Sequence, residues 1–408
     1  MEARQNGEKL QQNGPYARHK LHNRSRVGRL FRTVFTVSFL LAILTACAGP
    51  TDAIIGQVDP RVDLEAVEGL TKQVVYVATS RQATDEAGLL FSGERGAELG
   101  FARFTVTIPP DHKTGAIERP ERAPADPRSE FAIVDPTVFS GSKPFVNRLS
   151  RELRSRPPAN RDVLLFVHGF NTTLTEAVLR AAQFAHDSGF TGVPVVFSWA
   201  SRGSNFDYVY DLNSVLIARD KLIEAGLLIL EASPSGVDFV AHSMGNFLTM
   251  EVMRQASLQG RFNASRKFRD IILASPDIDV NLFETQLKGI PRSQRNFYVL
   301  ISANDKALGI SKFLAGDVPR VGDADPERLA DLGVTVVDLS EVKDTSSIHH
   351  SKFADVPEVV QLIGRHLESG SHFETSTTAS NVPANVVQSI ANVPITIFGG
   401  QPRSVGLQ

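Results

Sequence analysis

The sequence has almost no excess of charge of either sign. Its 408 residues carry a formal net charge of −2, and 22% of them are charged. A chain this close to neutral has no broad basic surface, which argues against nucleic acid as a partner. Cysteine is equally scarce, because the single Cys47 excludes an intrachain disulfide and any metal site built from several cysteines. The chain is nevertheless long enough for one large domain with a full hydrophobic core.

A membrane-spanning apolar run is also missing near the N-terminus. The run at residues 33–44 falls short of the roughly 20 residues of a spanning helix. It follows a basic segment, residues 18–32, that contains no acidic residue, and it ends in Leu44-Thr-Ala-Cys47. A basic segment, a short apolar run and small residues before a cleavage point are typical of a secretory signal. We therefore predict that residues 1–47 form a signal peptide.

The last residues of this segment, Leu44-Thr-Ala-Cys47, resemble the lipobox of bacterial lipoproteins. The resemblance implies that Cys47 is lipidated, becomes the first residue of the mature protein and anchors it in the cell envelope. Ala48 offers no acidic retention signal, so the expected location is the periplasmic face of the outer membrane. Two simpler interpretations stay open: an uncleaved signal anchor, and a cysteine that lies near an ordinary cleavage site by chance.

Beyond residue 162, short apolar runs alternate with stretches of helical pattern. The runs are rich in Val, Ile, Leu and Phe, like strands buried on both faces of a sheet. This alternation predicts an α/β fold, with a mostly parallel sheet covered by helices on both faces. The expected strands are residues 162–167, 193–199, 237–241, 268–274, 297–302 and 334–339, and the expected helices are 174–188, 212–232, 245–256, 282–288, 306–314 and 356–367.

The region before residue 162 has a different pattern. Residues 74–78 and 100–108 predict strands, and the alternation in the second is typical of an antiparallel strand with one exposed face. Residues 111–130, rich in Pro, Arg and Asp, predict a long surface loop, and a helix is expected at 144–154.

The expected organisation has one folded domain with a segment on either side. Residues 48–70 are predicted to be a tether, and residues 71–368 the domain. Residues 369–408 are predicted to be a flexible tail, although 393–398 could add an edge strand.

The stretch around Ser243 carries the clearest chemical signal. A buried strand at residues 237–241 is followed by one abrupt turn and a helix that opens at Gly245. A serine at that corner projects its Oγ outward, and the Met244 N–H at the helix start points toward any charge that develops beside it. The pattern small-x-Ser-x-Gly is the nucleophile elbow of serine hydrolases, here with Ala241 in place of the usual first glycine.

The strand at residues 162–167 runs into His168-Gly-Phe-Asn171. Ligands of parallel sheets bind at the carboxyl ends of the strands, and this turn lies at such an end. A His-Gly turn here resembles the oxyanion loop of α/β-hydrolases, and the resemblance makes the N–H groups of Phe170 and Met244 the oxyanion pair. A simple strand-to-helix turn capped by Asn171 or Thr173 is the other interpretation.

Asp305 follows the strand at residues 297–302, where a carboxylate can orient a histidine. It could instead cap the next helix, or do both. Asp277 and Asp279, after the preceding strand, are the rival candidates for the acid.

The general base is expected on the loop after the last strand, which carries His349 and His350. Histidine has a pKa near neutrality, and a late loop leaves it free to move between nucleophile and leaving group. His350 is favoured because it lies closer to the closing helix, and His349 remains the alternative. The other histidines, among them His242, His186 and His366, are expected to be structural or exposed.

The chain order Ser243, Asp305, His350 is that of the α/β-hydrolase fold. The motifs resemble an uncharacterised bacterial family of α/β-hydrolase-like proteins, over residues 74–367. They are Val75-Tyr-Val-Ala-Thr-Ser-Arg81, His168-Gly-Phe-Asn171, Phe197-Ser-Trp-Ala-Ser201, Ala241-His-Ser-Met-Gly-Asn246, Ala274-Ser-Pro-Asp-Ile-Asp279, Ala303-Asn-Asp305 and His350-Ser351.

This resemblance implies a serine hydrolase that needs neither a metal nor an organic cofactor. The expected substrate is a small-molecule or lipid ester of a carboxylic acid, or a related acyl compound. Trp199 could line the acyl pocket or simply pack in the core. A non-catalytic envelope protein with the same fold is the rival from another class. A lipase acting at a membrane surface would need an apolar lid, and the candidate insertions, 111–130 and 201–211, are polar or short.

Overall fold

The alternating region forms the centre of one large sheet. The computed structural model describes residues 52–344, 346–369, 385–390 and 393–399, and the sheet in this part of the chain has 11 strands in the order β10-β11-β9-β8-β7-β6-β4-β5-β1-β2-β3. Its strands are β1 (Thr71–Ala83), β2 (Phe91–Ile108), β3 (Ala132–Phe139), β4 (Val163–Val167), β5 (Val193–Ser198), β6 (Val237–His242), β7 (Phe268–Ala274), β8 (Phe297–Ile301), β9 (Thr335–Asp338), β10 (Asn385–Ile390) and β11 (Val393–Phe398).

In the sheet order from β9 to β1, every two adjacent strands are parallel, as the buried apolar runs predicted. Both edges of the sheet are antiparallel: β2 and β3 extend it beyond β1, and β11 and β10 extend it beyond β9. All the parallel strands therefore present their carboxyl ends at one edge, where the predicted site residues follow them.

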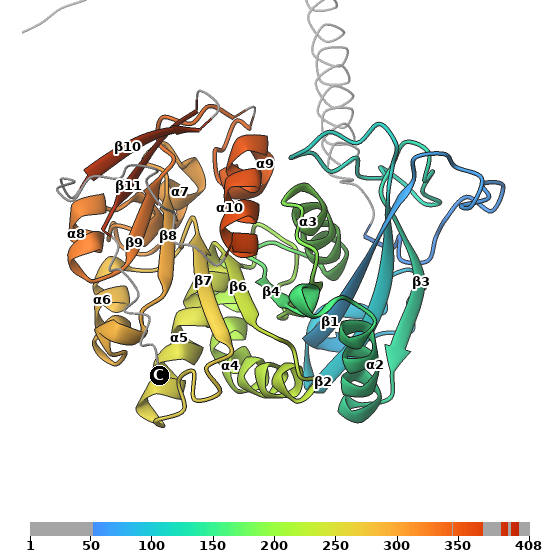
Figure 1. Cartoon of the computed structure of the whole chain (residues 1–408), viewed down its shortest axis with the longest axis horizontal. Coiled ribbons are helices and arrows are strands. Elements are labelled where there is room, and N and C mark those ends of the chain that lie inside the picture. Colours follow the sequence, from blue (N-terminus) through green and yellow to red (C-terminus); the bar gives the residue numbers. More distant parts are fainter. Residues whose placement is uncertain (1–51, 345, 370–384, 391–392, 400–408) are drawn as a thin grey trace, which may run out of the picture. The chain divides into compact units, whose positions relative to one another are not determined.

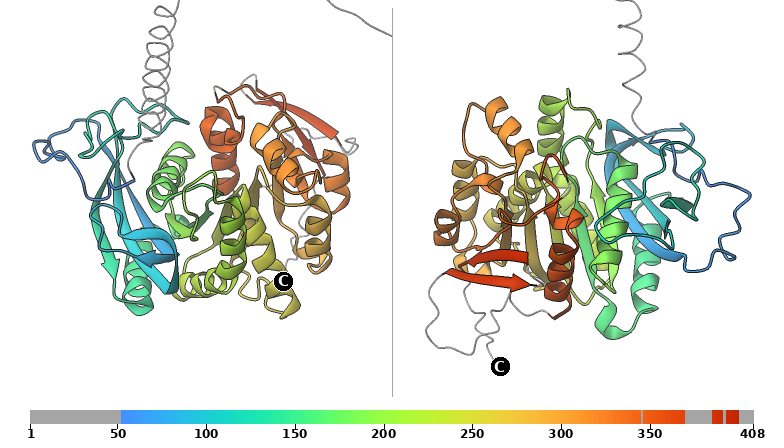
Figure 2. Two further views of the ribbon diagram at one scale, coloured as in Figure 1. Left: turned by 180° about the vertical axis from the view of Figure 1, so that it is seen from behind. Right: turned by 90° about the horizontal axis from the view of Figure 1, so that it is seen from above.

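Helices cover both faces of the sheet (Figure 1). They are α2 (Ser142–Arg154), α3 (Leu174–Asp187), α4 (Tyr208–Glu231), α5 (Met244–Leu258), α6 (Val280–Lys288), α7 (Lys306–Leu314), α8 (Pro326–Asp331), α9 (Lys352–Asp355) and α10 (Pro357–Ser369). Apolar residues of α2, α4, α5 and α6 form one core layer, and those of α3, α9 and α10 form the other. Figure 2 shows the same two layers from behind and from above. This is the predicted α/β-hydrolase architecture.

Strand β3, which pairs antiparallel with β2 at the edge of the sheet, was not predicted. It follows the irregular segment at 111–130, and its run of apolar residues is interrupted by Asp135, which has a positive φ of 49°, and by Pro136. Because proline is typical of edge strands, this composition fits a strand at the border of the sheet.

The segments outside the predicted domain take part in the fold where they are described. Ile54 and Ile55 are buried, although they belong to the expected tether. The tail expected at 369–408 contributes β10 and β11; β11 is the strand considered for 393–398, but it pairs with both β9 and β10, so β10 forms the edge of the sheet. The expected signal peptide with Cys47 lies outside the described residues. No helix within the described ranges is long and apolar enough to cross a membrane.

Candidate active site

Ser243 occupies the sharp corner between β6 and α5. Its backbone angles are φ 52° and ψ −122°, a region that residues other than glycine rarely adopt. Holding a side chain there costs on the order of 1–3 kcal/mol and needs support from the surroundings. The support is a hydrogen bond from Ser243 N–H to the Ala274 carbonyl (3.0 Å) and one from Asn246 Nδ2 to the Ser243 carbonyl (3.1 Å).

Two glycines let the chain pack closely around this corner. A Cβ at Gly245 would lie 2.3 Å from the His168 carbonyl oxygen, so only glycine lets α5 approach the end of β4. A Cβ at Gly169 would lie 2.8 Å from Ser243 Cβ. The segment that contains Gly169 and Phe170 therefore passes directly beside the serine.

The two predicted oxyanion donors belong to the two segments that meet at this corner. Met244 is the first residue of α5, so its N–H has no acceptor within the helix. Phe170 directly follows Gly169, and its ring packs edge-on against Tyr208 with centroids 5.3 Å apart. The assignment of these N–H groups to an oxyanion remains a prediction.

Asp305 and His350 form a hydrogen-bonded pair. His350 Nδ1 lies 2.7 Å from Asp305 Oδ2, and the Asp305 carboxylate is fully buried. Asp305 Oδ1 accepts the N–H groups of Ala307 and Leu308 and so caps α7. The carboxylate therefore has both roles considered from the sequence, one for each oxygen.

The pair lies beside the elbow. The His350 ring is 4.7 Å, centroid to centroid, from the ring of His242, the residue before Ser243. The His350 carbonyl oxygen is 3.2 Å from His242 Nε2. Because Nδ1 of His350 is bonded to Asp305, its Nε2 is the nitrogen left for a partner on the far side of the ring.

The neighbouring His349 has a different partner. Its Nδ1 contacts the buried carboxylate of Asp344, and its positive φ of 59° turns the chain so that the two histidines point to separate carboxylates. This contact leaves His350 as the histidine paired with Asp305.

The rival carboxylates are engaged elsewhere. Asp279 caps α6 through the N–H groups of Asn281 (2.8 Å) and Leu282 (3.1 Å). Asp277 forms a buried ion pair with Arg320 (3.1 Å). Neither has a histidine among its partners within the described ranges.

A comparison with family models supplies an independent finding. Residues 144–366, more than half of the chain, match the model of the family described as alpha/beta hydrolase of unknown function (DUF900). The chain belongs to this family. The match contains the elbow, the His168 loop, Asp305 and His350, whereas β1, β2 and β3 precede it. A comparison with curated proteins gave no match.

A buried arginine on β1 fixes the loop that passes beside Ser243. The Arg81 guanidinium donates to the carbonyl oxygens of Thr172 (2.6 Å) and Ser201 (2.7 Å) and to Ser198 Oγ (2.7 Å). Burial lowers the pKa of Arg81 to about 10, so it keeps its charge at neutral pH. In the sequence, Arg81 is noticeable only as a basic residue after an apolar strand, and no pattern assigned a role to it.

Asp211, in the first turn of α4, is the second buried group that contacts this loop. It accepts hydrogen bonds from Ser201 Oγ (2.5 Å), from Arg202 N–H (3.1 Å) and, at 3.4 Å, from Asn171 N–H. Burial raises the pKa of Asp211 above that of an ordinary aspartate. Asp211 was not predicted, because a lone acid in a helix normally indicates only a solvated face.

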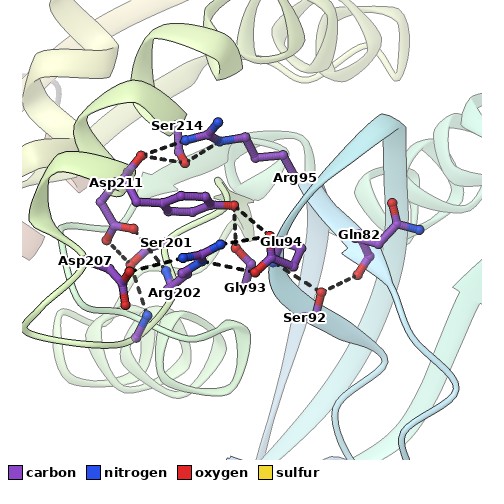
Figure 3. Close-up of polar contacts among 12 residues, drawn as sticks. Gln82, Ser92, Gly93, Glu94, Arg95, Ser201, Arg202, Asp207, Asp211 and Ser214 are labelled. Carbon is purple, nitrogen blue, oxygen red and sulfur yellow. Dashed lines mark hydrogen bonds and ion pairs between the residues drawn. The ribbon is translucent and has the colours of Figure 1, made fainter.

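The turn between β5 and α4 is clamped from outside by β2 (Figure 3). Arg202 donates to Glu94 (3.0 Å) and Asp207 (3.2 Å). The Tyr210 ring lies between two guanidinium groups, those of Arg95 (4.1 Å from its centroid) and Arg202 (3.7 Å). Two cation–π contacts and two ion pairs hold this turn in one position.

Two histidines near the site, His168 and His242, have a structural environment. His168 is buried, and burial together with the charge of Arg81 lowers its pKa to about 3. Trp199 stacks on His168 with centroids 5.0 Å apart and donates its indole N–H to the His168 carbonyl (2.8 Å), so it belongs to the core. Burial and the neighbouring His350 hold the pKa of His242 well below its ordinary value. Neither ring is suited to accept a proton at neutral pH.

A cavity of about 330 Å³ borders the elbow. Its lining includes Gly169, His242 and Ser351, and three charged side chains, Arg119, Glu176 and Arg180. It is large enough to receive part of a small ester.

Within the described ranges one group of side chains could hold a metal ion, namely His112, His186 and Asp187. Both ring nitrogens of His112 are already bonded, to Glu118 (2.7 Å) and to Asp187 (2.8 Å). Burial opposes protonation of His112, but these two carboxylates outweigh it and raise its pKa. The group is therefore accounted for as an ion-pair cluster.

Proposed function

We propose that this protein is a serine hydrolase that cleaves a carboxylic ester or a related acyl bond. The observation that carries the proposal is the His350–Asp305 pair beside a serine held at a strained corner. Membership of an alpha/beta hydrolase family supports the reaction class. It leaves the substrate open.

In the proposed mechanism Ser243 Oγ attacks the acyl carbon while His350 Nε2 takes its proton. Asp305 holds the proton on Nδ1 and stabilises the imidazolium that forms. The N–H groups of Phe170 and Met244 bind the oxyanion of the tetrahedral intermediate. His350 then returns the proton to the leaving alcohol, and the acyl group stays on Ser243. Water, activated by the same histidine, releases the acid and regenerates the serine.

A non-catalytic scaffold is the alternative, and the backbone of Ser243 argues against it. A positive φ at a serine is costly, and a binding scaffold gains nothing from it. The corner also lies beside the Gly169 segment, which leaves room for no side chain there. Both features serve a reactive hydroxyl.

Labelling with an organophosphorus probe tests the proposal. A serine hydroxyl is unreactive near neutral pH unless a base and an oxyanion site are already in place. We expect one adduct per folded chain, on the peptide that contains Ser243, identified by mass spectrometry. The adduct should be absent from Ser243→Ala and from denatured protein.

Ser275 provides an internal comparison, since it also follows a strand and has a positive φ of 45°. Labelling at Ser275 would mean that the nucleophile lies at the neighbouring strand end. A folded protein that takes up no probe would favour the scaffold.

We further propose that the enzyme is anchored at the periplasmic face of the outer membrane through a lipid on Cys47. The proposal rests on the basic, apolar leader and on Leu44-Thr-Ala-Cys47. Mass spectrometry of the mature N-terminus should find a diacyl- or triacylglyceryl group on Cys47. An unmodified N-terminus that begins at another residue would contradict it.

A further inference from the structure

Three segments that hydrogen bonds link to the site expose large apolar side chains to solvent. Phe206 is 99% exposed and Phe313 80% exposed, which is unusual for phenylalanine. The set, which we call the apolar rim, comprises Phe206 on the turn before α4, Val209 in the first turn of α4, Ile310, Phe313 and Leu314 on α7, and Ile348 on the loop before His350.

Hydrogen bonds connect all three segments to the site. Tyr208 Oη lies 2.9 Å from Ser311 Oγ, which joins the start of α4 to α7. Tyr208 Oη also donates to Asp277 (3.2 Å), whose own N–H donates to the Ser243 carbonyl (3.2 Å). The N–H of Lys306, the first residue of α7, donates to the Ile348 carbonyl (3.0 Å).

The exposure belongs to ordered elements. Ile310, Phe313 and Leu314 are spaced i, i+3, i+4 and so lie on one face of α7, whereas Leu308 and Ser311 face inward. The turn that carries Phe206 is the one clamped by Glu94 and Arg202 (Figure 3). An apolar face held outward in this way marks a surface that meets another apolar phase.

The position of Asp52 favours the membrane as the surface that the apolar rim meets. The Asp52 carbonyl accepts from Thr175 Oγ1 (2.7 Å), and its carboxylate accepts from Thr173 Oγ1 (3.1 Å). These threonines start α3, directly after the His168 loop, so the chain enters the domain at the edge that carries the site. Five residue steps separate Cys47 from Asp52, and an extended chain of that length spans at most about 18 Å.

We infer that the apolar rim docks on the lipid bilayer and that the substrates are acyl esters held in that bilayer. A lipid on Cys47 keeps the active-site edge close to the membrane, and insertion of Phe206 and Phe313 presents Ser243 to esters at the interface. The inference rests on the proposed hydrolase function for the substrate and on the proposed anchor for the orientation. The apolar rim is the apolar surface that a lipid substrate would need and that the sequence did not reveal.

Insertion can be measured without any catalysis. The full chain with Phe206→Cys or Phe313→Cys would carry an environment-sensitive fluorophore and be placed on vesicles of phosphatidylethanolamine and phosphatidylglycerol. Leu258→Cys is the matched control, because Leu258 is 65% exposed but ends α5, about 21 Å along the helix from Met244. The parent chain treated in the same way corrects for any label on Cys47.

We expect a lipid-borne quencher to reduce the emission at positions 206 and 313 by about half and to leave position 258 unchanged. Equal quenching at all three positions, or none at 206 and 313, would overturn the docking. Because this readout needs no active serine, it stays valid if Ser243 proves unreactive.

Activity separates docking from chemistry. Phe206→Ser combined with Phe313→Ser should lower turnover of an ester embedded in the vesicles about tenfold, since two inserting side chains are lost. Hydrolysis of a soluble short-chain ester should stay within about twofold, and Leu258→Ser should match the parent on both substrates. Equal losses on both substrates, or no loss on vesicles, would overturn the inference.

Discussion

Replacing His350 by alanine should lower the turnover of a short-chain aryl ester by a factor of about a thousand or more. The reason is that His350 is the histidine bonded to Asp305, whereas burial lowers the pKa of His168 and of His242 too far for either ring to accept a proton at neutral pH. Steady-state kinetics of the purified variant would measure the loss, with thermal unfolding recorded to show that the variant is folded.

His349→Ala is the matched control, since it removes the adjacent imidazole. Its partner is the buried carboxylate of Asp344, so we expect a loss of stability and a turnover within about fivefold of the parent. If the two losses are reversed, the base is His349. Small losses in both variants would remove histidine from the mechanism.

Changing Asp305 to asparagine should lower turnover by a factor of about ten thousand. The amide oxygen can still cap α7 through Ala307 and Leu308, because asparagine caps helices as well as aspartate does. The amide nitrogen, however, would face His350 Nδ1 as a donor. The imidazole would then carry its proton on Nε2, where it cannot accept the proton of Ser243.

The comparison variant is Asp277→Asn, which alters the rival carboxylate but leaves the Asp305–His350 pair in place. It weakens the ion pair with Arg320, and we expect turnover to fall far less than in Asp305→Asn. Kinetics of the two variants side by side decide between the acids. A larger loss for Asp277→Asn would assign the acid to the preceding strand.

The sequence predicted the parallel centre of the fold because each strand there is buried on both faces and each helix has an apolar stripe. It predicted the elbow because Gly245 and Ala241 leave room for the close approach of α5 and β4. It favoured His350 but left His349 open, since their separate partners depend on a positive φ at His349 and on the contact of His350 with Asp305, 45 positions earlier in the chain.

Other features had no local signal. Arg81 acts on carbonyl oxygens that lie about 90 to 120 positions further along the chain, which no spacing pattern reports. The predicted tail supplies β10 and β11 because β9 has an unpaired edge that these strands cover. The apolar rim was hidden because its residues are scattered over three segments that only the fold brings together.

The double use of Asp305 links chemistry to local opening of α7. While the carboxylate is seated, one oxygen protects the amides of Ala307 and Leu308 and the other orients His350. Fraying of the first turn of α7 would expose these two amides to exchange and release His350 at the same time. A molecule whose cap is open therefore has no carboxylate to orient His350. Under the proposed mechanism, amide hydrogen exchange at these two positions would report the share of molecules able to react, and a membrane that steadies α7 would increase that share.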